Sequence, residues 1–262
     1  MRHAHRHAIC QRRTALLQMG ALDYLGDNWL FNLEVQQFQT LADDINEGYK
    51  KLPQFTGQYR AARTPFQVAP LFLAQYSNFD NDADLVTGQR LYTEAGAAYP
   101  MLWSYGYLTP TLKYRQLNYD LSEGPFFEDD SPSAGAALAN LDGGLVFERN
   151  TSVAGRQLLQ TLEPRLYYLY SEYEQQTDQP DFDSAELTFT YNQLFRETRF
   201  SGRDRLDDAN QISVGLTSQF IDMASGRSLF SASLGQIFYF RDRKVRLLAI
   251  DEPLDESSSE IA

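Results

Sequence analysis

The sequence predicts an all-β fold made of antiparallel strands of a transmembrane β-barrel. Apolar and polar residues alternate with a period of two in many runs, which short and long polar connections join. Aromatic residues make up 13% of the chain, although its mean hydropathy is -0.45. The 16 tyrosines suit surfaces that contact lipid on one side and water on the other, as both membrane interfaces of a barrel require.

The clearest alternating run covers residues 157–170. Leu162 and Leu166 fall on one face of this expected strand, whereas Glu163 and Arg165 fall on the other. Several runs exceed the usual strand length of about 5–6 residues and approach the roughly 9–11 that cross a bilayer at a tilt. Further strands are expected at residues 109–115, 185–195, 211–220 and 229–240, and weaker ones at 20–25, 28–39, 54–61, 66–78, 90–99 and 134–148.

The connections between these runs are of two kinds. Residues 142–144 and 225–227 contain glycine and predict tight turns, whereas residues 172–183 and 197–210 predict long polar loops. This combination is typical of outer-membrane barrels. No apolar stretch reaches the roughly 18 residues of a membrane-spanning helix, but a barrel strand meets lipid only at every second residue.

The charge balance excludes one class of partner. The chain has 35 acidic and 23 basic residues and a formal net charge of -12. Nucleic-acid binding needs a basic face, so nucleic acid is not an expected partner. Much of the acidic excess lies in residues 128–130, 178–183 and 251–260, which we interpret as solvated loops.

Two prolines lie inside alternating runs. Pro110 and Pro164 cannot donate a hydrogen bond to a neighbouring strand, so each implies an edge, a bulge or weakened pairing. A local bulge is the plainer interpretation, and a seam that opens is the functional alternative.

Histidine and cysteine occur only in the first ten residues. His3, His5 and His7 have the alternate spacing of ligands on one strand face, but this terminal segment lacks a nearby carboxylate and we expect no metal there. Cys10 is the one cysteine, and we expect a stray thiol without an intramolecular disulfide. The absence of histidine after residue 7 argues against a Ser-His or Cys-His catalytic pair, so we predict no enzyme.

No other set of catalytic, metal or cofactor ligands stands out. The sequence has no glycine-rich phosphate loop, no dinucleotide-binding motif and no carboxylate pair marked by its spacing. Residues 204–208 superficially suggest a calcium loop, but they lack the alternate ligands, the glycine and the terminal glutamate. A salt-bridged loop is expected instead, and no metal or cofactor is predicted.

Four charged residues share the predicted polar face of their strands: Lys113, Arg115, Glu163 and Arg165. In a barrel that face lines the lumen. Ion pairing across neighbouring strands is the plainer interpretation. The functional alternative is contact with a polar or anionic cargo, or with a protein that plugs the lumen.

An ordered set of short stretches resembles one known family. The most distinctive is residues 162–170, with the sequence LEPRLYYLY, and residues 191–196 and 234–240 follow in the same order. Each stretch alone is weak, but together they resemble the barrel of the lipopolysaccharide-assembly (LptD, or organic solvent tolerance) family over about residues 20–250. The other matching stretches are 20–41, 52–53, 109–119, 146–149, 199–205 and 209–211.

This resemblance implies both a fold and a function. The family's fold is a very large antiparallel barrel of the Gram-negative cell outer membrane, joined to a periplasmic jelly-roll-like domain. Its implied partners are the lipid bilayer, an LptE-type plug lipoprotein in the lumen and the periplasmic Lpt bridge that delivers lipopolysaccharide. The barrel inserts this lipopolysaccharide into the outer leaflet, and no bond is made or broken.

The chain also departs from the family pattern. We find no signal peptide, periplasmic domain or family disulfide cysteines, and the first and last barrel strands that flank the family's lateral gate are not recognised. We therefore expect a partial barrel, and no gate role is assigned to Pro110 or Pro164. The expected division is a poorly matching leader (1–19), a partial barrel domain (20–250) and an acidic loop (251–262).

Two kinds of protein remain as alternatives. Another large outer-membrane barrel, such as a porin or a siderophore receptor, would share the alternation. A soluble β-sandwich binding module would instead pack its aromatic faces into a core and dissolve without detergent. If the barrel interpretation holds, the chain alone has two unpaired edges that lipid cannot satisfy, so it should not insert by itself.

Overall fold

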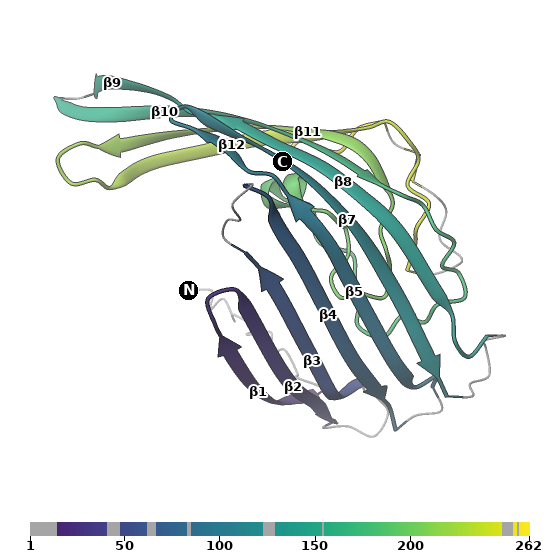
Figure 1. Ribbon diagram of the computed structural model, residues 1–262. Coiled ribbons are helices and arrows are strands. Elements are labelled where there is room, and N and C mark those ends of the chain that lie inside the picture. The colour runs from purple at the N-terminus through teal and green to yellow at the C-terminus, as the bar shows by residue number, and fades with distance from the viewer. Residues whose placement is uncertain are drawn as a thin grey trace, which may run out of the picture.

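The computed structural model describes residues 15–40, 48–61, 67–82, 85–122, 129–153, 155–247, 254–255 and 257–262. Within them, twelve strands form one antiparallel sheet, which confirms the predicted all-β fold (Figure 1). The strands are β1 (Ala15–Leu25), β2 (Trp29–Thr40), β3 (Lys50–Arg60), β4 (Ala69–Asp80), β5 (Gly88–Ala98), β6 (Met101–Trp103), β7 (Gly106–Leu121), β8 (Ser133–Leu145), β9 (Phe147–Val153), β10 (Arg156–Ser171), β11 (Ala209–Asp222) and β12 (Ser228–Tyr239).

The sheet is open within the described residues. Its order is β1-β2-β3-β4-β5-β7-β8-β10-β11-β12, and the short strands β6 and β9 pair with β7 and β10. Most expected strands are present but longer than predicted: β7 and β10 contain 16 residues each, and β1 begins at Ala15 rather than at residue 20. Among the described residues, no helix is long and apolar enough to cross a membrane.

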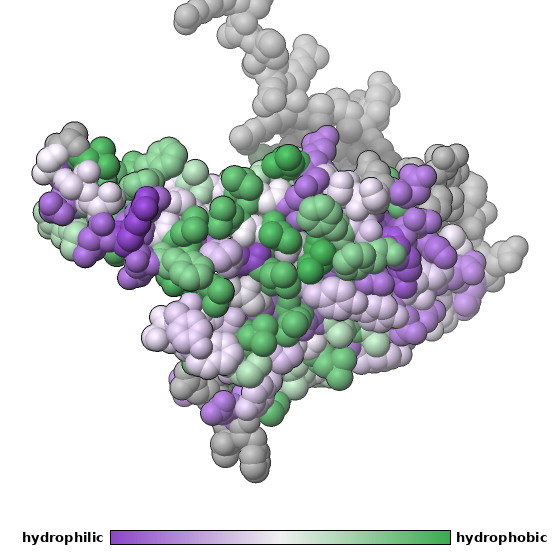
Figure 2. Space-filling model, turned by 90° about the horizontal axis from the view of Figure 1, so that it is seen from above, coloured by the Kyte–Doolittle hydropathy of each residue, from purple (hydrophilic) through white to green (hydrophobic). Residues whose placement is uncertain are grey.

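The two faces of the sheet differ in chemistry. Because paired residues share a face, the register carries each strand's alternation across the sheet. On the outer face, Leu22, Leu112 and Leu234 expose 70%, 65% and 58% of their surface. Figure 2 shows apolar side chains gathered in a band over the sheet. The opposite, inner face is the concave side in Figure 1, and it carries buried side chains such as Leu117 and Tyr119.

The predicted strand at residues 185–195 is wrong. These residues belong to a segment, 172–208, that leaves β10, folds over the inner face and returns to β11 (Figure 1). We call it the inserted segment. It contains the 3-10 helix η1 (Tyr191–Phe195) and an isolated bridge between Glu186 and Phe200. Exposed and half-buried residues do alternate over 186–190, but this extended chain packs against the sheet without joining it.

One of the two predicted glycine turns is wrong and the other is confirmed. Residues 142–144 lie inside β8, and a Cβ atom at Gly144 would lie 2.7 Å from a ring carbon of Tyr107. Glycine therefore makes room for an aromatic ring there, not for a turn. The turn at residues 225–227 does connect β11 to β12, and Gly226 has φ 67°, a value that favours glycine.

The prolines lie opposite breaks in neighbouring strands, so the predicted bulges are wrong. The β7–β8 register runs through Pro110, and the β10–β11 register runs through Pro164, both without a shift. On its other side, β7 changes partner at Pro110 from β6 to β5, and β10 changes partner at Pro164 from β9 to β8. Each missing N–H thus falls where the adjacent strand is interrupted.

The last described residues extend the sheet beside β12. Tyr239 N–H donates to the Ser257 carbonyl at 2.9 Å, and Ala262 N–H donates to the Gly235 carbonyl at 2.9 Å. We expected an acidic loop over 251–262, but residues 257–262 instead run antiparallel to β12. Sheet pairing therefore continues beyond β12.

A pair of glycine substitutions tests the packing of this sheet. A Cβ atom at Gly96 would lie 2.2 Å from the Leu112 carbonyl oxygen, whereas a Cβ at Gly20 would meet no atom within 4 Å. We expect Gly96→Ala to destabilise the protein by about 1–3 kcal/mol because the backbone must shift. Gly20→Ala is the control and should be neutral or slightly stabilising. Urea midpoints followed by circular dichroism measure both, and equal effects would contradict the observed β5–β7 packing.

Candidate functional site

Aromatic packing anchors the inserted segment to the inner face. Phe182 stacks on Phe79 of β4 with ring centroids 4.3 Å apart, and Tyr49 meets Phe182 edge-on at 4.8 Å. Leu206 is fully buried in the same cluster. Each such side chain contributes about 1.5–3 kcal/mol when buried, so the segment is a packed layer and not a solvated loop.

A buried ionic cluster, which we call the Arg90 cluster, ties the inserted segment to the sheet. The Arg90 guanidinium of β5 is fully buried and forms ion pairs with Asp183, at 2.7 Å, and with Asp204. Lys51 of β3 forms a second ion pair with Asp183 at 2.8 Å. The Tyr119 hydroxyl donates to an Asp204 carboxylate oxygen at 3.1 Å. Loss of any partner would leave charge buried without compensation, so the members stabilise the segment together.

Two acids of the inserted segment have opposite pKa shifts. Burial opposes the ionisation of Asp183, but Arg90 and Lys51 outweigh it and hold the pKa of Asp183 well below its usual range. For Asp181, burial and the nearby Asp204 charge raise the pKa to about 6. The segment therefore contains a permanent anion and, beside it, an acid that titrates just below neutral pH.

Further hydrogen bonds hold the end of the inserted segment. Arg115 of β7 donates to the Ser171 hydroxyl at 2.6 Å and to the Asp207 carbonyl at 3.1 Å. Asp208 is buried and accepts from the backbone N–H of Val245 at 2.9 Å. The chain after β12 is thereby joined to the return of the segment into β11.

Arg205 connects three stretches of backbone. Its guanidinium donates five hydrogen bonds of 2.7–3.1 Å to carbonyl oxygens, the full number of N–H donors that the group has. A salt-bridged loop was predicted at residues 204–208, and its ion pairs are present, but the loop is buried. The five acceptors are the carbonyls of Gln179, Pro180, Asp204, Arg246 and Leu247.

The four predicted lumen residues all lie on the inner face. The register places Lys113 and Arg115 of β7 on this face, together with Glu163 and Arg165 of β10. Arg115 is buried under the inserted segment, whereas Glu163 is half-buried and accepts from the Thr161 hydroxyl at 2.8 Å. The inserted segment therefore covers part of the predicted polar face.

Ion pairing across neighbouring strands, the plainer interpretation, is present for two of these residues. Lys113 bonds Glu94 of β5 at 2.9 Å and Glu197 of the inserted segment at 2.8 Å. Arg165 bonds Asp142 of β8 at 2.6 Å. Contact of these residues with a passing cargo or with a plugging protein stays a prediction.

Sequence reasoning missed the Arg90 cluster. The acidic residues at 178–183 were interpreted as a solvated loop, but the Asp183 side chain is only 14% exposed. Arg90 and Asp183 are 93 positions apart, so no local pattern connects them. Only the folded structure shows that these two residues form an ion pair.

The histidine and cysteine predictions fall outside the described residues, because His3, His5, His7 and Cys10 precede residue 15. Within the part of the chain that the structure describes, no group of three His, Cys, Asp or Glu side chains is arranged to hold a metal ion. The buried charged side chains, such as Arg90 and Asp204, lie instead between the inner face and the inserted segment.

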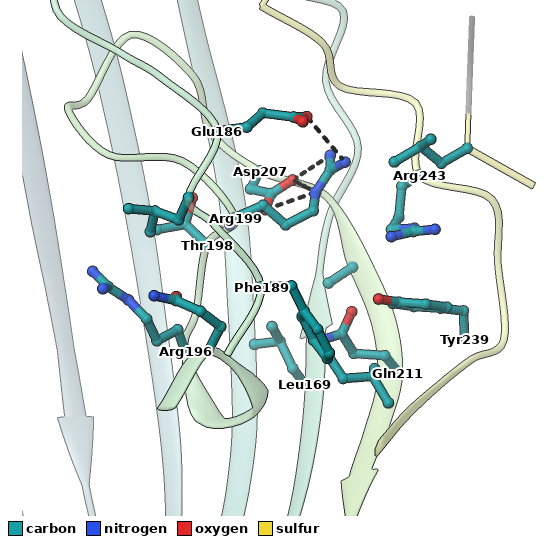
Figure 3. Close-up of a pocket in the computed structure, with 15 residues that line it drawn as sticks. Leu169, Glu186, Phe189, Arg196, Thr198, Arg199, Asp207, Gln211, Tyr239 and Arg243 are labelled. Atoms are coloured by element: carbon teal, nitrogen blue, oxygen red, sulfur yellow. Dashed lines mark hydrogen bonds and ion pairs between the residues drawn. The ribbon is translucent and has the colours of Figure 1, made fainter. Parts of the chain in front are cut away.

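A pocket of about 170 Å³ lies between the inserted segment and the sheet (Figure 3). Gln211 of β11 and Tyr239 of β12 form part of its floor, and Phe189 and Arg199 come from the inserted segment. Arg199 is held by Asp207 through hydrogen bonds of 2.8 and 3.1 Å. The lining combines hydrogen-bonding groups with apolar side chains, a combination typical of binding pockets.

Comparison with known proteins identifies related sequences. The model of the family LptD, described as LPS transport system D, matches residues 6–262. A protein of Pseudomonas aeruginosa (strain LESB58) is 39% identical over 91% of this chain and 29% of its own length. A protein of Saccharophagus degradans is 38% identical over 90% of this chain and 29% of its own length. A protein of Alkalilimnicola ehrlichii is 38% identical over 88% of this chain and 31% of its own length. All three are named LPS-assembly protein LptD, and the chain spans less than a third of their length.

Asp204→Asn should loosen the inserted segment. The variant leaves the Arg90 charge buried with one fewer carboxylate, which costs about 3–5 kcal/mol. We expect a lower urea midpoint and faster proteolysis within residues 172–208. Asp142→Asn is the matched control, because its ion pair with Arg165 is partly exposed and contributes about 1 kcal/mol or less. Equal protease sensitivity of the two variants would show that the Arg90 cluster is not the anchor.

Asp181 should lower stability as the pH rises through about 6. The raised pKa of Asp181 means that the folded state holds this proton more tightly than the unfolded chain, so its stabilisation is complete in acid and lost above about 6. Asp181→Asn removes the titration and keeps an oxygen that can accept from Ser184 N–H. We expect the variant to be more stable than the parent at about pH 7.5, with the difference shrinking towards pH 5. Parallel urea-midpoint profiles for the two proteins would contradict this pH dependence.

Proposed function

Because this chain belongs to the LptD family, we propose that it forms part of the outer-membrane barrel that inserts lipopolysaccharide into the outer leaflet. The proposal assigns the chain a transport role, with no catalytic residue and no cofactor. Its location would be the cell outer membrane of a Gram-negative bacterium.

The apolar outer face is the observation that carries this proposal. Leu22, Leu112 and Leu234 each expose more than half of their surface, and neighbouring strands continue the band. In water such a band would drive aggregation, whereas in a bilayer it meets hydrocarbon. A soluble β-sandwich would bury these side chains in a core, so this alternative is not favoured.

The two edges of the sheet indicate how the chain would work. Within the described residues, β1 has a neighbour on one side only, and β12 is paired on its second side only near residues 257–262. Unpaired backbone groups cannot remain in the hydrocarbon of a membrane. We propose that further barrel strands, such as the longer relatives have room for, pair with both edges.

The proposed partners follow from the family resemblance. Lipopolysaccharide would be the cargo, an LptE-type lipoprotein would occupy the lumen, and the periplasmic Lpt bridge would deliver the cargo through an N-terminal domain. The charged inner face supports polar contacts of this kind, because Lys113 and Arg165 already form ion pairs there. Another large barrel such as a porin is not favoured, since the matched relatives are named for LPS assembly.

A chimeric barrel tests the proposed function. Residues 15–262 would replace the matching part of the Pseudomonas aeruginosa relative in cells depleted of their own protein. We expect restored lipopolysaccharide at the cell surface, measured by surface labelling, and restored resistance to hydrophobic antibiotics. A chimera that folds in the outer membrane but leaves the surface without new lipopolysaccharide would contradict the transport role.

Three control proteins accompany this experiment. Leu112→Arg in the chimera places a charge on the lipid-facing band at a cost of about 2–4 kcal/mol near the bilayer midplane, and should prevent barrel assembly. Leu112→Ala, which keeps this position of the outer face apolar, should still assemble. The isolated chain should not enter lipid vesicles as a stable monomer, because its two edges lack partners.

A further inference from the structure

The inner-face pocket has the size of one six-membered ring. It encloses about 170 Å³ between the inserted segment, strands β10–β12 and the chain after β12 (Figure 3). For comparison, a cavity of about 150 Å³ holds one benzene molecule. A compact ring with a few substituents therefore fits, whereas an extended acyl chain does not.

The floor of the pocket contains a polar group that the described protein leaves unused. Gln211 is only 8% exposed, and its side-chain amide has no hydrogen-bond partner among the described residues. In Figure 3 this amide lies between the side chains of Phe189 and Tyr239. Because Gln211 lines the pocket, a ligand bound there can reach this amide. A ligand that both donates and accepts hydrogen bonds would pair with both atoms of the amide.

A second unused donor lies on the wall of the pocket. Arg199 uses its Nε and Nη2 groups on Asp207, but its Nη1 is buried without a hydrogen bond. The nearest acid to Nη1 is Glu186, at 3.9 Å, which exceeds hydrogen-bond distance. Glu186 is 57% exposed and marks the open side of the pocket. A hydroxyl group placed here could accept from Arg199 and donate to Glu186.

The charges of the pocket favour a neutral ligand. The lining contains three arginines and two carboxylates, so its charges nearly cancel, and the Arg196 guanidinium points away from Arg199 in Figure 3. A phosphate group would approach two carboxylates as well as the arginines, so it gains little. A neutral molecule with hydroxyl groups avoids this repulsion.

Apolar surfaces complete the lining. Phe189, Leu169, Ile237 and the ring of Tyr239 supply flat or aliphatic contacts, and Arg243 stacks on Tyr239 at 3.7 Å from the ring centroid. A ring with C–H groups on its faces and hydroxyl groups on its edge matches both kinds of surface. We propose that the pocket binds one neutral sugar ring, with Gln211 and Arg199 as its hydrogen-bonding groups. We assign this sugar ring to the saccharide part of lipopolysaccharide, an assignment that rests on the proposed function.

Ligand-observed NMR on the purified chimeric barrel tests this proposal. The probe is core oligosaccharide released from lipopolysaccharide by mild acid, with glucose and inorganic phosphate in separate arms. Gln211→Leu should raise the dissociation constant at least about tenfold, because it removes the floor amide. The substitution leaves no partner unsatisfied, so folding should persist. Gln219→Leu, on the same face of β11 outside the pocket, is the matched control and should bind as the parent does.

Each outcome supports or overturns a defined part of the proposal. No binding by the parent, or equal binding by Gln211→Leu, would overturn the sugar site. Displacement of the oligosaccharide by phosphate would overturn the neutral ligand, and equally tight binding of glucose would overturn its assignment to lipopolysaccharide. A chimera that restores surface lipopolysaccharide but binds no sugar refutes only the pocket. A chimera that binds sugar but restores nothing refutes only the transport role.

Discussion

The burial of Arg90 between Asp183 and Asp204 is the interaction on which the inner side of this protein depends. A guanidinium on a central strand cannot lie in an apolar layer without carboxylates, and both carboxylates come from the inserted segment. The segment in turn needs the sheet, because its own regular structure is one short 3-10 helix and an isolated bridge. The sheet and the inserted segment therefore stabilise each other through ion pairs as well as through aromatic packing.

A second constraint is that the two faces of one sheet meet different surroundings. The outer face presents leucine and aromatic side chains outwards, whereas the inner face presents charged groups that the inserted segment and neighbouring strands neutralise. Alternation along each strand produces this separation, and the register carries it from strand to strand, with local shifts in the β2–β3, β3–β4 and β11–β12 pairs. A one-residue slip at any strand would turn its charges towards the apolar outer face.

Breaks in the hydrogen-bond ladder fall where the sequence tolerates them. Pro110 and Pro164 have no N–H group to donate. The neighbouring strand is interrupted beside each of them, so no acceptor there is left without a donor. In the inner-face pocket, the corresponding feature is a set of polar side-chain groups without a partner in the sheet. Arg199 keeps a buried Nη1 without a hydrogen bond, and the amide of Gln211 lines the same pocket, so both groups are available to the ligand that we propose.

The sequence by itself determined the all-β class, most strands, the chemistry of the two faces and the family resemblance. Period-two alternation is local, so runs such as 157–170 reveal their two faces without any tertiary contact. Alternation alone did not distinguish a paired strand from an extended segment, and residues 185–195 were therefore mistaken for one. Only the tertiary structure decided that this segment folds inwards, since the partners of Asp183 and Asp204 lie about a hundred positions away. The pocket was equally invisible, because Gln211, Arg199 and Tyr239 meet only after three separate stretches of chain have packed together.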